Sequence, residues 1–197
     1  MVRNMNPHRS ARGATLIEVL VTIVIIAFGL LGMAGLQMRM QMSEMEAYQR
    51  SQALLLLSDM ASRISTNRAN AAAYITGTAN PMGTSFDCSS LGTTRAATDL
   101  KEWCSALQGA AEFTTVGGTT TQQGAMIGGR GCVQRVSLSG DVDYVVTVAW
   151  QGLTPISAPP AAVTCGAGLY NGGASGACAN DLCRRTVTTV VRIGSLT

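Results

Sequence analysis

The stretch Arg12-Gly13-Ala14-Thr15-Leu16-Ile17-Glu18 is followed by eighteen uncharged residues, Val19 to Leu36. Glu18 is therefore a single acid at the start of an otherwise apolar segment. A carboxylate in hydrocarbon costs roughly 2.5 to 3.5 kcal/mol on insertion scales, so a partner of Glu18 must offset that cost. As a helix, residues 14–36 would extend roughly 34 Å, which is enough to cross a bilayer core of about 30 Å.

The segment Gly13-Ala14-Thr15-Leu16-Ile17-Glu18 resembles the processing site of type IV prepilins. The resemblance implies that a prepilin peptidase cuts after Gly13 on the cytoplasmic side and that Ala14 becomes the N-methylated first residue. It also implies that Glu18 meets the terminal amine of a neighbouring subunit in a filament. A positive helix N-terminus with a protonated amine beside it is a suitable partner for a buried carboxylate. The alternative is a Glu18 that turns toward the lipid headgroups within its own chain.

Charge is divided unevenly at Gly13. The leader, residues 1–13, carries Arg3, Arg9 and Arg12 and no acid, which leaves equal numbers of basic and acidic side chains afterwards. By the positive-inside rule the leader stays in the cytoplasm, and we expect a single pass of the inner membrane with a periplasmic head. The absence of net charge in the mature chain argues against a general nucleic-acid binder. The alternative, a signal peptide cut after residues 32–34, is disfavoured by Glu18.

The helical pattern continues beyond the membrane segment. No Gly or Pro lies between Gln37 and Asn70, and apolar residues recur mostly three or four apart, at Met38, Met42, Met45, Ala53, Leu56, Met60 and Ile64. We expect one helix over residues 14–66, of which 14–36 spans the membrane and 37–66 packs on a head. Three glycines near the end of the span allow close helix packing or weaken the helix: Gly29, Gly32 and Gly35.

The remaining residues, 67–197, predict a small, loop-rich globular head. Loops with room for one short strand precede a capping-box-like segment, Asp99 to Glu102, that predicts a short helix over 99–109 with Trp103 as a core anchor. Residues 114–131 are Gly- and Thr-rich and predict a flexible stretch or a weak hairpin. Alternating apolar residues predict strands at about 132–139, 142–150 and 184–193, with a turn at Gly140-Asp141 and the long helix as cover.

All six cysteines lie in the part of the chain expected beyond the membrane: Cys88, Cys104, Cys132, Cys165, Cys178 and Cys183. An even number of cysteines in an oxidising compartment predicts up to three disulfides. We favour Cys88 with Cys104 because they bracket one short segment, and we leave the other four unassigned. A zinc site on Cys178 and Cys183 is the alternative, but their spacing is loose and no His follows the leader.

The mature sequence lacks the residues of common catalytic sites. It has no His and a single Lys, Lys101, which removes the usual general base and imidazole metal ligands. We therefore predict no enzyme activity, no cofactor and no metal. Asp141 and Asp143 are interpreted as turn residues. Arg184, Arg185 and Arg192 suggest either a small anion or DNA patch or, more simply, a solvated strand edge protected by charge.

A finer resemblance is carried by residues 28–37, Phe-Gly-Leu-Leu-Gly-Met-Ala-Gly-Leu-Gln, and by Asp99-Leu-Lys-Glu-Trp103. Both are similar to PilV-like minor pilins of type IV pili. The resemblance implies an α+β pilin fold, with a long N-terminal helix on a small antiparallel sheet and disulfide-stapled loops. It also implies that the helix, from Leu16, Ile17, Val19 and Leu20 through the three glycines, joins the filament core.

The same resemblance implies a structural subunit of the complex that primes pilus assembly and sits at the tip. Its partners would be other minor pilins, the major pilin and a tip adhesin, in a pilus that serves adhesion and twitching motility. Two alternatives stay open. A type II secretion pseudopilin would share the N-terminal segment, and a DNA-receptor pilin would bind duplex DNA in a salt-dependent manner.

Overall fold

The computed structural model describes residues 13, 15–110, 113–122, 124, 126–138, 141–172 and 176–194. The leader up to Arg12, the predicted N-terminal residue Ala14 and the turn residue Gly140 lie outside the described residues. The chain divides into two compact units, Met1–Ser43 and Glu44–Thr197, which we describe separately.

The first unit contains the beginning of a single long helix, α1 (Leu16–Thr66). Every residue described in this unit has an exposed side chain, including the apolar ones. The sequence predicts a helix over 14–66. The structure begins α1 at Leu16 instead, because the hydroxyl and carbonyl oxygens of Thr15 accept the first helical amide hydrogen bonds.

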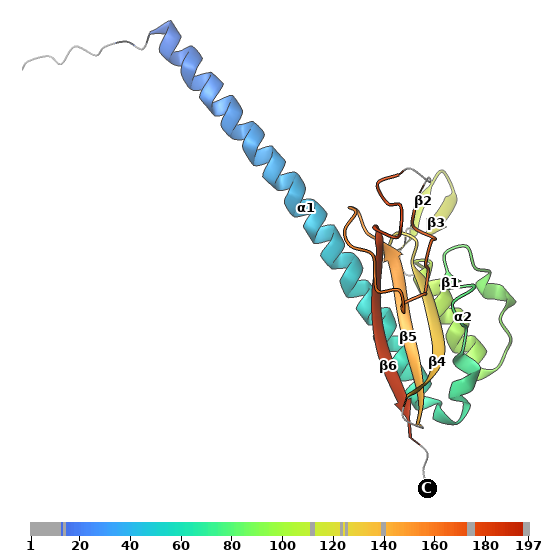
Figure 1. Cartoon of the computed structure of the whole chain (residues 1–197). Coiled ribbons are helices and arrows are strands. Elements are labelled where there is room, and N and C mark those ends of the chain that lie inside the picture. Colours follow the sequence, from blue (N-terminus) through green and yellow to red (C-terminus); the bar gives the residue numbers. More distant parts are fainter. Residues whose placement is uncertain are drawn as a thin grey trace, which may run out of the picture. The chain divides into compact units, whose positions relative to one another are not determined.

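The second unit continues α1 and adds the head. In chain order its further elements are η1 (Arg68–Tyr74), β1 (Met82–Gly83), η2 (Cys88–Ser90), α2 (Arg95–Leu107), β2 (Phe113–Val116), β3 (Thr119–Gln122), β4 (Arg130–Leu138), β5 (Asp141–Gln151) and β6 (Arg184–Ile193). An antiparallel sheet has the order β1-β4-β5-β6, and β2 pairs with β3 in a separate ribbon. The α+β, pilin-like architecture predicted from the sequence is confirmed (Figure 1).

The main core lies between α1 and one face of the sheet. Buried side chains of α1, which are Ala53, Leu57, Met60 and Ile64, join the inward-facing residues of β5, which are Tyr144, Val146, Val148 and Trp150. Figure 1 shows the lower half of α1 passing behind β4, β5 and β6. Alternation along β5 places every second side chain against the helix, so burial of this face removes a large apolar area from water.

The opposite face of β5 is also buried. Thr147 and Ala149 are inaccessible to solvent, because the long connection between β5 and β6 folds back over them. Sγ of Cys165 lies 3.9 Å from the carbonyl oxygen of Thr147. A Cβ atom on Gly166 would lie 2.8 Å from the ring of Tyr170 and 3.3 Å from Cβ of Ala149. This connection is therefore a packed layer, although it contains no regular strand or helix in its described part.

Several predicted boundaries need correction. The short helix begins at Arg95 rather than Asp99 and ends at Leu107 rather than residue 109, because Oγ1 of Thr94 accepts a hydrogen bond from the amide of Ala97 and caps it. Strands predicted at 132–139 and 142–150 run from Arg130 to Leu138 and from Asp141 to Gln151. The third strand, 184–193, coincides with β6.

The Gly- and Thr-rich region contains the hairpin β2–β3. Its turn is Gly117-Gly118, with φ of 60° and 83°, which is the left-handed backbone that a two-residue hairpin turn requires. The preceding loop region holds η1, η2 and the two-residue strand β1.

All six cysteines are paired. Cys88 bonds to Cys104, as the sequence led us to expect, and this link ties η2 to α2. The four that were left unassigned form Cys132–Cys165 and Cys178–Cys183. The first of these holds the connection between β5 and β6 against β4, and the second closes the end of that connection just before β6.

Candidate assembly interface

The first turn of α1 is shaped by Thr15 and Glu18. Oγ1 of Thr15 lies 3.4 Å from the amide nitrogen of Glu18, and the Thr15 carbonyl oxygen accepts from Glu18 and Val19 at 3.1 and 3.2 Å. Thr15 is thus the N-cap and Glu18 the third helical residue, where an acid interacts favourably with the helix dipole. Glu18 is exposed, and within the described part of the chain no cation forms an ion pair with its carboxylate.

The surface that follows Glu18 is apolar on all sides. The sequence-predicted helix residues Leu16, Ile17, Val19 and Leu20 are all exposed, and so are the large apolar side chains that follow. An 18-residue window of α1 has a mean hydropathy of 2.7, and α1 is the one described helix that is long and apolar enough to cross a membrane. Apolar surface of this extent is unstable in water and must be covered by lipid or by other helices.

Three glycines interrupt this surface. Gly29, Gly32 and Gly35 lie within α1, and no other part of the described chain comes within 4 Å of a Cβ placed on any of them. No contact within the structure therefore requires glycine there. A flat patch that lets another helix approach closely, or a locally weaker helix, would each explain them.

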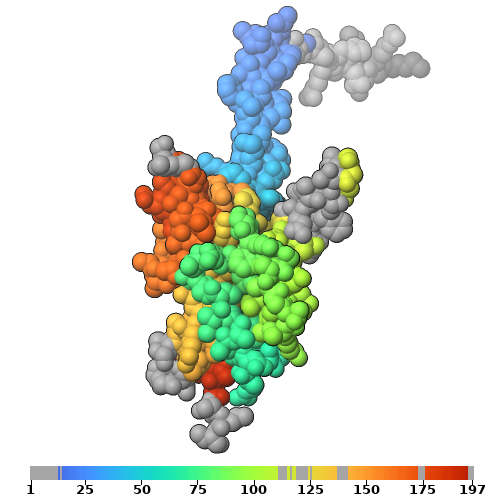
Figure 2. Space-filling view, turned by 90° about the vertical axis from the view of Figure 1, so that its right-hand side faces the viewer, coloured from blue at the N-terminus to red at the C-terminus, as the bar shows by residue number. Residues whose placement is uncertain are grey.

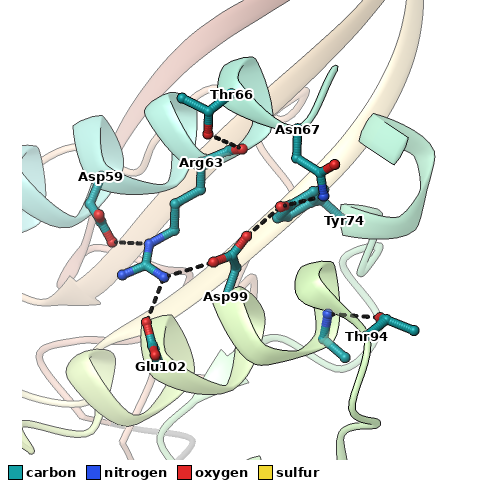
Figure 3. A network of polar contacts seen from close by, with 9 residues as sticks. Asp59, Arg63, Thr66, Asn67, Tyr74, Thr94, Asp99 and Glu102 are labelled. Atoms are coloured by element: carbon teal, nitrogen blue, oxygen red, sulfur yellow. Dashed lines mark hydrogen bonds and ion pairs between the residues drawn. The ribbon is translucent and has the colours of Figure 1, made fainter. Parts of the chain in front are cut away.

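On the head, Arg63 links the last turn of α1 to α2 (Figure 3). Its guanidinium binds Asp59 at 2.9 Å, Asp99 at 3.1 Å and Glu102 at 2.7 Å. Tyr74 of η1 donates a short hydrogen bond to the second oxygen of Asp99. One cation thus joins three carboxylates from two helices. The sequence interpretation of Asp99 as a helix cap is wrong, because its carboxylate is engaged by Arg63 and Tyr74.

The network raises the pKa values of Arg63 and Tyr74. Burial alone would lower the pKa of Arg63, but hydrogen bonds to Glu102, Asp59 and Asp99 outweigh it and raise that pKa further. Burial and the hydrogen bond to Asp99 raise the pKa of Tyr74. Arg63 is thus charged and Tyr74 neutral at physiological pH, so the network is a fixed clamp between α1 and α2.

Trp103 is a second clamp. Its Nε1 donates to the carbonyl oxygen of Leu56 in α1 at 2.9 Å, and its ring lies so close to β4 that a Cβ on Gly131 would be only 2.2 Å from it. Trp103 is fully buried. The prediction of a core anchor therefore agrees with the structure, which also shows three elements meeting at this side chain.

The three arginines of β6 each form an ion pair within the head. Arg184 is buried, with Nε 3.1 Å from Asp181, and Nη2 of Arg185 donates to the carbonyl of Thr154 at 2.6 Å and lies 3.5 Å from Glu46 of α1. Only Arg192 has a largely exposed side chain, and it binds Asp143 at 2.8 and 3.1 Å. The interpretation of a solvated, charge-protected strand edge fails for Arg184 and Arg185, which serve the packing of the loop.

Asp143 also differs from its sequence interpretation. It is fully buried in β5 rather than part of the turn, and it pairs in register with Arg192 of β6. Hydrogen bonds from Arg192 hold the pKa of this carboxyl below its usual value, against the opposing effect of burial.

The head has an open groove of about 400 Å³ between η1, the loop that follows it and α2. Its apolar walls include Ile75, Met82, Phe86, Leu91 and Leu100, and the elements that form it are the green part of the face in Figure 2. Among the described residues no group of three or more His, Cys, Asp or Glu side chains could hold a metal ion.

Comparison with known proteins bears on both units. A family model described as the type IV pilin Tt1218 matches residues 35–116, and a model of the prokaryotic N-terminal methylation motif matches residues 8–34. No curated protein and no solved structure gives a significant match. The two family matches and the fold support a pilin subunit of the type IV class, whose N-terminal motif implies processing by a prepilin peptidase and assembly with other pilins.

Two residues with structural roles, one at the start of α1 and one in the head, were missed from the sequence. Thr15 begins a Thr-x-x-Glu pattern with Glu18, which is a recognisable helix-start signal. Arg63 was not singled out, although Asp59 lies four residues before it, at the spacing of a helical ion pair. The partners on α2 could not be found this way, because their distance from Arg63 is set only by the folded chain.

Proposed function

We propose that this protein is a PilV-like minor pilin, a structural subunit of the complex that primes type IV pilus assembly and sits at the pilus tip. The observation that carries the proposal is Glu18, a lone acid at the start of an exposed apolar helix and within the matched methylation motif. A charge in that place is stable only if another group neutralises it. The amine of a neighbouring subunit, at a processed Ala14, is a group of the right charge.

The mechanism is one of packing rather than catalysis. Before assembly, α1 holds the protein in the inner membrane with its N-terminus in the cytoplasm and its head in the periplasm. During assembly the helix leaves the lipid and joins the helices of other minor pilins and the major pilin. Glu18 sets the register of that step, because only one axial offset brings its carboxylate to the partner's amine. The head then presents its surface to other tip subunits, including an adhesin.

The first test is the mature N-terminus. Intact-mass and peptide mass spectrometry of the protein purified from membranes should show a chain that begins with N-methylated Ala14. A product that begins after residue 34, free of the membrane, would overturn the proposal.

The second test is assembly. Glu18→Ala should leave membrane insertion intact or improved, since it removes a carboxylate from hydrocarbon. It should reduce copurification with partner pilins by about tenfold, the effect of losing roughly 1.4 kcal/mol from one ion pair in a low-dielectric setting. The matched control is Glu44→Ala, an exposed acid farther along the same helix. Equal copurification of wild type and Glu18→Ala contradicts the role given to Glu18.

A type II secretion pseudopilin shares the N-terminal features and differs in its partners, which the same copurification would identify.

A DNA-receptor role is less favoured, because Arg184, Arg185 and Arg192 each face a carboxylate of the head. Salt-independent or absent binding of duplex DNA would agree with this view.

A further inference from the structure

The start of α1 lies very close to the proposed cleavage site. Gly13 is outside any helix, and α1 begins at Leu16. Thr15 sets this boundary, since both its hydroxyl and its carbonyl oxygen accept from the amide of Glu18. A helix N-terminus has amides with no partner inside the helix, and a Thr hydroxyl at the N-cap satisfies one of them.

If the Thr15 hydroxyl is removed, the start of α1 can shift to a defined earlier position. Ala14 is the best helix former and a poor N-cap, whereas Gly13 is an acceptable N-cap. Loss of the Thr15 acceptor would therefore favour a helix that starts two residues earlier, capped by Gly13. The peptide bond after Gly13 would then belong to the first helical turn, and a peptidase would have to unwind that turn before binding the bond in an extended form.

We propose that Thr15 is a positioning residue for prepilin processing: its hydroxyl ends α1 at Leu16 and keeps the bond after Gly13 outside the helix. The inference rests on the proposed function, because it concerns the same cleavage. In that reaction water adds across the amide between Gly13 and Ala14, leaving a carboxylate on Gly13 and an amine on Ala14. Thr15 takes no part in the bond changes and acts through the conformation of the substrate.

The test separates the hydroxyl's role as a cap from recognition of the threonine shape. Thr15→Asn keeps a strong cap with a different shape, and Thr15→Val keeps the shape without the acceptor. The control is Thr22→Val, which removes a hydroxyl that donates to the Val19 carbonyl at 2.8 Å inside α1. The full-length precursor in proteoliposomes is treated with purified prepilin peptidase, and kcat/KM for leader release is measured by mass spectrometry.

We expect Thr15→Val to lower kcat/KM about fivefold, the usual effect of a lost cap on a helix-start equilibrium. Thr15→Asn and Thr22→Val should stay within about twofold of wild type. A readout independent of cleavage is hydrogen exchange of the Ile17 amide. This amide is unbonded when Thr15 is the cap and bonds to the Gly13 carbonyl when Gly13 is the cap, so its protection should rise in Thr15→Val.

Three results would overturn the inference. Fast cleavage of Thr15→Val with slow cleavage of Thr15→Asn means that the peptidase reads the side-chain shape. Equal rates for all variants mean that the cap does not control access. Unchanged Ile17 exchange in a slow Thr15→Val means that the helix start has not moved. Failure of the proposed function looks different, since the wild-type precursor would then not be cut after Gly13 at all.

Discussion

The ion pair between Asp143 and Arg192 makes the stability of the sheet depend on pH. The Asp143 carboxylate is fully buried, while the guanidinium of Arg192 remains largely exposed and covers it. Removal of the partner would leave a buried, unpaired charge, which proteins tolerate poorly. The pair also explains why an acid can occupy a buried position near the end of the strand pairing, where it lies directly opposite Arg192 in the register of β5 and β6.

The sign of the pH effect follows from the lowered pKa of Asp143. Because this pKa lies below its ordinary value of 3.8 in the folded chain, the unfolded chain binds more protons in acid. The stabilisation is therefore present above about pH 5 and is lost as the pH falls through 4 and below.

Asp143→Asn should accordingly lower the Tm at pH 7, and the Tm values of variant and wild type should converge toward pH 3. Thermal unfolding of the full chain in detergent, followed by circular dichroism at several pH values, measures this. Glu44→Gln, at an exposed position, is the control and should show no such convergence. A Tm difference that stays constant with pH would refute the assignment.

At the scale of elements, Trp103 holds α1, α2 and β4 together. Its ring fills the space beside Gly131, where even a Cβ would be 2.2 Å from the indole. Its Nε1 donates a hydrogen bond to a backbone carbonyl of α1. A glycine in a strand interior is normally a weakness, and here it admits a large ring. The position of α2 against the sheet thus depends on the absence of a side chain at Gly131.

Gly131→Ala should therefore destabilise the head by about 1–3 kcal/mol, the usual cost of overpacking a core. Gly92→Ala is the control, since its added methyl would meet only Cβ of Ala97 at an ordinary 3.8 Å. Urea unfolding in detergent measures both. An equal effect of the two substitutions would show that the ring shifts without cost.

Trp103→Phe tests the other half of this anchor. It removes the hydrogen bond to the Leu56 carbonyl, which remains bonded within its helix, and should cost about 0.5–1.5 kcal/mol for the bond plus the loss of ring volume. The same unfolding measurement applies, and an unchanged midpoint would contradict the role of Nε1.

The elements that could be predicted are those with a strong period. The long helix ends at Thr66 as expected, and the alternation in β5 and β6 gave strands close to their observed bounds. The start of α2 was misplaced because Asp99 resembles a helix cap in the sequence. In the folded chain its carboxylate instead accepts hydrogen bonds from Arg63 and Tyr74, which are distant in sequence. Glu18 could be found because a charge in an apolar run is a local signal. The clamps of the head could not, because each joins residues far apart in the chain.

At the scale of the whole molecule, the three disulfide bonds all lie in the head. The three disulfides close loops with sequence separations of 16, 33 and 5 residues, and none involves the first unit. Because a longer closed loop restricts the unfolded chain more, the links should differ in their contribution.

Replacing Cys132 and Cys165 by serine should lower the free energy of unfolding by about 4 kcal/mol, and replacing Cys178 and Cys183 by about 2 kcal/mol, on the loop-entropy relation. Urea unfolding of the full chain in detergent without reductant gives both values. The reverse order would mean that native contacts of the short loop, such as those of Asp181, outweigh chain entropy.

The sequence of the connection between β5 and β6 has a consequence for its sensitivity to proteases. Long irregular segments at a surface are where proteases usually cut. Between Arg135 and Arg184, however, the sequence contains no Lys or Arg, so enzymes of trypsin specificity find no bond to attack along the whole segment. The first arginine they would meet, Arg184, is itself buried. The least regular region of the head should therefore resist cleavage by enzymes of this one specificity.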